Sequence, residues 1–89
     1  MEKREIHYSG HVQGVGFRYT TAYIARGHEV VGFVKNLADG RVQLVVEGQV
    51  GAVDAFLDEV AVKLGGYIRE TKQSKTPATG RFTDFTITY

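Results

Sequence analysis

The sequence contains no cysteine, and this absence removes several kinds of chemistry at once. Without cysteine there can be no disulfide bond, no zinc-thiolate cluster and no thiol nucleophile, so a cysteine-dependent phosphatase mechanism is excluded. The hydrophobic core must therefore hold the fold by itself. The composition fits a reducing compartment, and we expect the protein to act in the cytoplasm.

Long apolar runs are also missing from the sequence. Residues 1–15 lack the continuous apolar stretch of a signal peptide, and no segment approaches the roughly 20 apolar residues of a membrane-spanning helix. We therefore expect no membrane partner. Because domains are rarely divided below about 100 to 150 residues, the 89 residues are expected to form one domain over 1–89.

An excess of charge of either sign is absent as well, since 11 basic and 10 acidic residues give a net charge of +1. Such a balanced chain lacks the basic field that attracts nucleic acid, so we expect no nucleic-acid partner. The balance does not exclude a local anion site, because a few aligned backbone N–H groups and one arginine can bind phosphate whatever the total charge.

The spacing of apolar residues predicts a mixed order of strands and helices. Alternation and β-branched residues predict strands over 4–9, 30–35, 41–47, 67–72 and 85–89. Apolar steps of three and four predict helices over 18–25 and 53–64, and the polar segment 72–80 is expected to be a flexible loop. The turn signal Asp39-Gly40 predicts an antiparallel hairpin. The order β-α-β-β-α-β-β predicts an α+β fold, a two-layer α/β sandwich of the ferredoxin-like (split βαβ) type, with an antiparallel sheet and an extra C-terminal strand.

A glycine-rich loop joins the first predicted strand to the first predicted helix. Gly10, Gly14 and Gly16 fall close together, so the backbone of residues 10–17 can adopt conformations that other residues avoid. Unpaired N–H groups converge where a loop enters a helix, and Arg18 could bind two phosphate oxygens there. The spacing alone leaves two alternatives open, an anion site or an ordinary tight loop followed by a solvated arginine.

Other phosphate-binding loops do not fit this segment. A Walker loop would need lysine followed by Ser or Thr after its second glycine, where Phe17 and Arg18 stand. A dinucleotide fingerprint that starts at Gly14 would need glycine at position 19, which is Tyr19. A cysteine phosphatase loop would place cysteine where Val12 stands.

The loop and the second predicted strand carry two recognisable motifs. Segment 10–18 reads GHVQGVGFR, and segment 32–36 reads GFVKN and is followed by Gly40, Val42 and Gly48. These segments resemble the two signatures of the acylphosphatase family, and every fixed position of the first signature agrees. The resemblance runs over most of the chain and agrees with the predicted order of elements. It implies a small, stand-alone acylphosphatase.

What the resemblance implies is a metal-independent hydrolase without a cofactor, which cleaves the carboxyl-phosphate bond of acyl phosphates. Asn36 is implied to position the water for in-line attack. Phosphoryl binding is implied for Arg18 and for the backbone N–H groups of five loop residues, Gln13, Gly14, Val15, Gly16 and Phe17. No general acid is required, because the leaving carboxylate has a conjugate acid with a pKa near ~4. The expected partners are a small-molecule acyl phosphate and inorganic phosphate, the latter as product and competitive inhibitor, and we expect a monomer.

Several residues also have simpler interpretations. Asn36 could be a turn residue at the entrance to the hairpin. His7 and His11 share the parity of one strand, but four strand residues separate them by roughly 13 Å, too far for one metal ion. The helix acids Asp54, Asp58 and Glu59 are expected to form a solvated face and not a catalytic acid pair. Five aromatic residues are expected in the core: Tyr8, Phe33, Phe56, Phe85 and Tyr89.

The alternative from another class is a non-catalytic phosphate- or RNA-binding module of the same fold. Phe33 stands in a segment that faintly resembles the aromatic motif of RNA-binding strands. Such a motif requires several aromatic residues on one exposed strand face, and segment 41–47 has none. The sequence therefore favours the enzyme.

Overall fold

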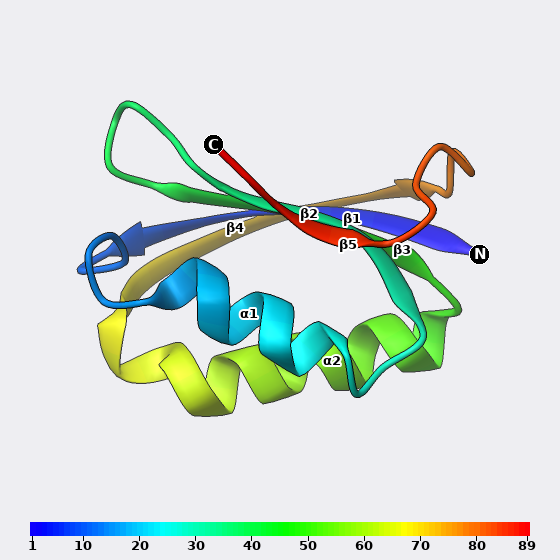
Figure 1. The fold of residues 1–89 in the computed structure, drawn as a ribbon, viewed down its shortest axis with the longest axis horizontal. Coiled ribbons are helices and arrows are strands. Elements are labelled where there is room, and N and C mark those ends of the chain that lie inside the picture. Colours follow the sequence, from blue (N-terminus) through cyan, green and yellow to red (C-terminus); the bar gives the residue numbers. More distant parts are fainter.

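The computed structural model describes all residues from 1 to 89, and its elements follow the predicted order. They are β1 (Glu2–Gly10), α1 (Phe17–Ala25), β2 (Val30–Asn36), β3 (Val42–Gly48), α2 (Val50–Leu64), a short 3-10 helix (Gly65–Tyr67), β4 (Ile68–Pro77) and β5 (Phe85–Thr88). Both helices cover the same face of one sheet (Figure 1). The predicted α+β two-layer sandwich is confirmed. Neither helix is long and apolar enough to reach across a membrane.

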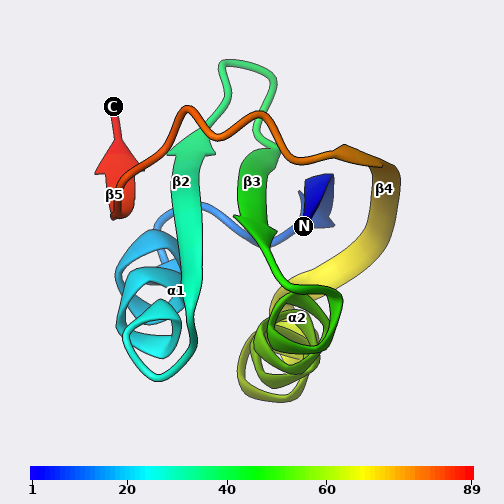
Figure 2. The same cartoon turned by 90° about the vertical axis from the view of Figure 1, so that its right-hand side faces the viewer.

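The strand order across the sheet is β4-β1-β3-β2-β5. The pairs β1–β3, β1–β4 and β2–β3 are antiparallel, which confirms the predicted hairpin, whereas β5 lies parallel to β2 and makes the sheet mixed. Figure 2 shows why: residues 78–84 (orange) pass from β4 at one edge, over β3 and β2, to β5 at the other edge. Because β5 returns antiparallel to β4, it runs in the same direction as its neighbour β2.

The core lies between the sheet and the two helices. Strand residues of one parity, such as Ile6, Val34 and Leu44, are completely buried against the helix layer. The helix residues that meet them are Phe17, Thr21, Ile24, Val53, Phe56, Val60 and Leu64. β2 and β3 approach each other closely at Gly32, where an added Cβ would lie 1.9 Å from the carbonyl oxygen of Val45. This close approach explains the glycine at the start of the GFVKN segment.

The second half of β4 differs from the sequence prediction. Residues 72–80 were expected to be a flexible loop, but residues 72–77 continue β4 and pair with β1 as far as Glu2 and Pro77. The prediction was wrong because every side chain from Arg69 to Pro77 is exposed, so no apolar alternation marks this part of the strand. Backbone pairing at the sheet edge holds it, and a proline at the end of an edge strand removes no necessary hydrogen bond.

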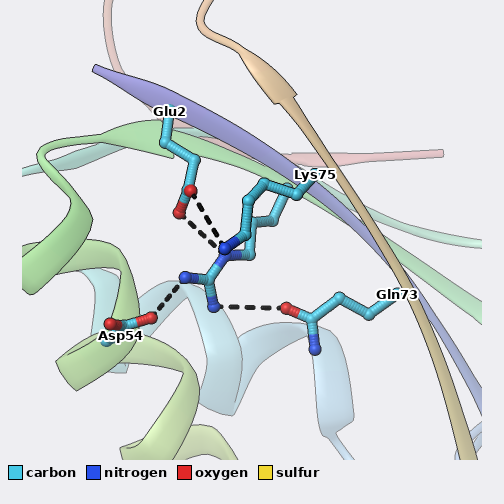
Figure 3. Close-up of polar contacts among 5 residues, drawn as sticks. Glu2, Asp54, Gln73 and Lys75 are labelled. Atoms are coloured by element: carbon cyan, nitrogen blue, oxygen red, sulfur yellow. Dashed lines mark hydrogen bonds and ion pairs between the residues drawn. The ribbon is translucent and has the colours of Figure 1, made fainter.

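An ion-pair network joins β1 and β4 to the first turns of α2. The guanidinium of Arg4 donates through Nε to Glu2 Oε2 at 2.8 Å and through Nη1 to Gln73 Oε1 at 3.2 Å, and its Nη2 donates to Asp54. Glu2, Gln73, Lys75 and Asp54 gather around this group in Figure 3. Asp54 is exposed, as expected for a solvated helix face, and it also fixes α2 to the sheet through Arg4.

The crossing segment 78–84 is held to the face of the sheet opposite the helices by Glu47 on β3. Glu47 is only 2% exposed, and its carboxylate accepts hydrogen bonds from the Thr79 N–H at 3.1 Å, the Thr79 hydroxyl at 2.6 Å and the Gly80 N–H at 3.1 Å. Phe82 in the same segment packs against Phe33 with ring centroids 6.0 Å apart. Phe33 is therefore covered and does not form the exposed stacking surface that an RNA-binding strand requires.

The hydrogen bonds to Glu47 predict how stability depends on pH. Burial alone would raise the pKa of this carboxyl, but the hydrogen bonds from Thr79 and Gly80 outweigh burial and lower the pKa below its usual value. Their contribution to the free energy of unfolding is complete above the unfolded-state pKa and is lost as the pH falls through the folded-state pKa.

We expect Glu47→Gln to lower the free energy of unfolding by about 1 to 3 kcal/mol at pH 7, because an amide nitrogen would replace one charged acceptor. The melting temperatures of the variant and the wild type should converge as the pH falls well below about 4. Thermal unfolding from pH 3 to pH 8 checks this, and a difference that is equally large at both ends would contradict it.

Candidate active site

The glycine-rich loop and the β2–β3 hairpin loop lie at the same end of the sheet (Figure 1). The side-chain amide of Gln13 donates from Nε2 to the Leu37 carbonyl at 2.9 Å and to the Arg41 carbonyl at 3.0 Å. On the other side of the loop, the His11 N–H donates to the Tyr67 carbonyl at 2.9 Å. The loop is thus tied to both of its neighbours.

The hairpin loop that receives Gln13 is itself closed by local hydrogen bonds. The Leu37 N–H donates to the Arg41 carbonyl at 2.8 Å, and the Asp39 carboxylate accepts from the Arg41 N–H at 3.1 Å and from the Arg41 guanidinium at 2.9 Å. The hydrogen bond from the backbone of Arg41, with the ion pair to its side chain, lowers the pKa of Asp39. An ionised Asp39 therefore keeps the two Gln13 acceptors in place at neutral pH.

The backbone N–H groups of the glycine-rich loop have no hydrogen-bond partners within the chain. Gly14 and Gly16 have φ values of 80° and 77°, and Gly16 is the N-cap of α1 without a side-chain cap. None of the N–H groups from Val12 to Phe17 donates a hydrogen bond within the chain. α1 also has no acidic residue in its first turn. This arrangement leaves the positive end of the helix dipole open to an anion.

A cavity of about 220 Å³ lies at this helix start, lined by Val12, Gly14, Gly16, Phe17, Arg18, Tyr19 and Asn36. Arg18 and Asn36 come from different elements, α1 and the last residue of β2. Arg18 makes no ion pair within the chain, and the side-chain oxygen of Asn36 is buried without a hydrogen-bond partner. The two residues singled out by the sequence thus line one cavity, and neither side chain makes a hydrogen bond or ion pair elsewhere in the chain.

Gln13 and Val15 do not line this cavity, although their backbones belong to the loop. The Gln13 side chain is committed to the hairpin, and Val15 packs against the hydrophobic core. The bridging role of the Gln13 side chain was not predicted from the sequence. No spacing rule could have revealed it, because its acceptors are backbone carbonyls more than twenty residues away.

A pair of tyrosines beside Arg18 was also missed. The Arg18 guanidinium carbon lies 4.7 Å from the centre of the Tyr89 ring, and the Tyr19 and Tyr89 hydroxyls are 3.5 Å apart. Tyr89 was expected in the core, but this was wrong: it follows the last residue of β5 and is 78% exposed. The hydrogen bond with Tyr19 raises the pKa of Tyr89 against the opposing effect of Arg18, so a neutral ring stacks on the arginine.

The remaining candidate residues do not join the cavity. Asp54 pairs with Arg4, and His28 Nε2 lies 2.9 Å from Glu59 Oε1, which fixes the α1–β2 connection to α2. No group of three His, Cys, Asp or Glu side chains lies close enough together to hold a metal ion. The polar side-chain groups that line the cavity are therefore the guanidinium of Arg18, the amide of Asn36 and the phenol of Tyr19.

Comparison with known proteins places this geometry in a family. The acylphosphatase family model matches residues 4–87. An acylphosphatase of Thermotoga maritima is 39% identical over 90 residues, which cover 100% of this chain and 99% of the relative. An acylphosphatase of Archaeoglobus fulgidus is 52% identical over 61 residues, 68% of this chain and 66% of the relative.

Solved structures agree with the sequence comparison. The crystal structure of an acylphosphatase from Bacillus subtilis superposes with a TM-score of 0.89 at 30% identity and covers 100% of both chains. In HypF from T. kodakarensis, the match has a TM-score of 0.85 at 33% identity and covers 100% of this chain but 12% of that larger one. The family model matches residues 4–87, and relatives align along the whole length of the chain. This chain therefore belongs to the acylphosphatase family and is a hydrolase of acyl phosphates.

Proposed function

We propose that the cavity at the start of α1 binds the phosphoryl group of the acyl phosphate and that Asn36 positions the attacking water. The observation that carries this proposal is that Arg18, Asn36 and the glycine-rich loop, whose N–H groups have no partners within the chain, all line one cavity. Arg18, Asn36 and the loop N–H groups together suffice for the proposed reaction, so it requires no second copy, and we propose that the protein acts as a monomer.

The phosphoryl group is held by the backbone and by Arg18. N–H groups from Gln13 to Phe17 donate to its oxygens, and the dipole of the nine-residue helix α1 favours its negative charge. The planar guanidinium of Arg18 can donate to two oxygens together, and its stacking on Tyr89 limits the orientations it can take. These groups stabilise charge in the transition state without having to reorganise.

Asn36 supplies the position of the water. Its backbone is held in the β2–β3 ladder opposite Val42, so its side chain enters the cavity from a rigid strand. The side-chain amide of Asn36 forms a hydrogen bond with the water, whose oxygen attacks phosphorus in line with the acyl oxygen. The O–P bond forms as the P–O bond to the acyl group breaks, and the carboxylate leaves with the electron pair. The water proton passes to a phosphate oxygen, so no protein acid is needed.

The first experiment tests the reaction itself. We expect the wild-type protein to hydrolyse an acyl phosphate such as acetyl phosphate in excess EDTA, and to act weakly on phosphate monoesters, whose alkoxide leaving group needs an acid. Inorganic phosphate should inhibit competitively, because it occupies the same cavity. Loss of activity with EDTA that returns on addition of a divalent metal would contradict the proposal, as would a preference for monoesters.

The second experiment separates the roles of Arg18 and Asn36. Arg18→Lys should lower kcat/KM about 10²-fold and weaken inhibition by phosphate, because an ammonium cannot reproduce the paired hydrogen bonds of a guanidinium to two phosphoryl oxygens. Asn36→Ala should lower kcat by about 10² to 10³, while inhibition by phosphate stays near the wild-type value.

Matched controls for these variants lie outside the cavity, at Arg69→Lys on β4 and Gln43→Ala on β3, and both should retain activity. If Asn36→Ala keeps its kcat and only lowers the melting temperature, Asn36 is a turn residue and the water has no positioning group.

The third experiment tests the Gln13 bridge. Gln13→Glu is nearly isosteric, but it points carboxylate oxygens at the two carbonyls that now accept hydrogen bonds. We expect weaker inhibition by phosphate and a kcat/KM at least about tenfold lower, because the loop and the hairpin separate and a misplaced group costs rate. Gln73→Glu on the exposed strand β4 is the control. Unchanged phosphate inhibition in Gln13→Glu would show that the bridge does not shape the cavity.

A further inference from the structure

A second hollow adjoins the phosphate-binding cavity along the exposed side of α1. It has a volume of about 520 Å³ and is lined by Tyr19, Thr20, Ala22, Tyr23, Arg26 and Ile87. We refer to these six residues as the tyrosine groove. Tyr19 lines both the cavity and the groove, so the two hollows adjoin at this side chain. A substrate whose phosphoryl group fills the cavity can therefore extend its other end into the groove.

The groove exposes two tyrosine rings that do not pack into the hydrophobic core. α1 buries its other side through Phe17, Thr21, Ile24 and Ala25, whereas Tyr19 and Tyr23 are 65% and 72% exposed. Four residues apart on one helix, they lie on the same face about 6 Å from each other along the axis. Large rings left on the surface beside a reaction site are suited to binding a ligand.

The chemistry of the groove favours a flat, apolar ring. Tyr19 and Tyr23 can pack edge-to-face or offset against an aromatic group, and Ile87 of β5 adds an aliphatic wall. Arg26 makes no ion pair within the chain, and a guanidinium free of a carboxylate can stack on an aromatic face. No acidic residue lines the groove, so nothing in it repels an acyl phosphate.

We propose that the tyrosine groove binds the acyl group of the substrate and selects for aromatic acyl groups. The proposal rests on the proposed function, since the carboxyl-phosphate bond must lie at the junction of the cavity and the groove, beside Tyr19. A short acyl group such as acetyl ends before Tyr23, whereas a benzoyl ring reaches into the groove. The ring loses contact with water there, and each aromatic contact strengthens its binding.

The test compares kcat/KM for benzoyl phosphate with that for acetyl phosphate in each variant. Taking the ratio between variants removes the different intrinsic reactivities of the two substrates. Tyr23→Ala is expected to lower the benzoyl-to-acetyl ratio about three- to tenfold, because one aromatic contact is lost. Tyr23→Phe keeps the ring and should keep the ratio. Val62→Ala, which shortens another exposed apolar residue, on α2, is the matched control and should leave both activities unchanged.

Two results would overturn the proposal: an unchanged ratio in Tyr23→Ala, or an equal fall for both substrates, which would place the effect at the phosphate end. Both are distinct from a failure of the proposed function, in which the wild-type protein would hydrolyse neither substrate. Tyr23 is exposed, so Tyr23→Ala should fold, and its melting temperature is measured on the same preparation.

Discussion

The two hydrogen bonds from the Gln13 amide to the hairpin carbonyls are the contacts on which the candidate site depends. Arg18 belongs to the segment after β1, and Asn36 belongs to the end of β2, so neither element by itself brings them together. Gln13 joins the two loops, and the cavity forms where they meet. Each hydrogen bond contributes only about 0.5 to 1.5 kcal/mol to stability, but together they hold the glycine-rich loop beside the hairpin that carries Asn36, and we propose that this sets the distance between the anion-binding groups and the amide that positions the water.

Glycine serves the site in two physically different ways. At Gly32 the requirement is space, because β3 lies so close that a side chain would meet the Val45 carbonyl. At Gly14 and Gly16 nothing lies within 4 Å of an added Cβ, and the requirement is the positive φ of the backbone. The first glycine allows the strand pair that carries Asn36, and the other two shape the backbone that we propose binds the anion.

The sequence could predict the features that repeat along the chain or that carry a known motif. Val53, Phe56, Val60 and Leu64 showed the period of a buried helix face, and two motifs pointed to Arg18 and Asn36. It could not predict the end of β4, because an edge strand held by backbone pairing has no apolar signal. Contacts between distant residues were equally hidden: the Gln13 bridge, the stacking of Tyr89 on Arg18 and the junction of the cavity with the tyrosine groove depend on the assembled fold.

The central claim is that backbone N–H groups of the glycine-rich loop, with Arg18, bind the phosphoryl group. A titration of the ¹⁵N-labelled protein with inorganic phosphate, followed by amide chemical shifts, tests it most directly. The account predicts that the largest shifts fall on the amides of residues 13–17 and on the Arg18 guanidinium, with small shifts on β4 and the second half of α2. Saturable shifts centred on another surface, with the amides of residues 13–17 unmoved, would contradict it.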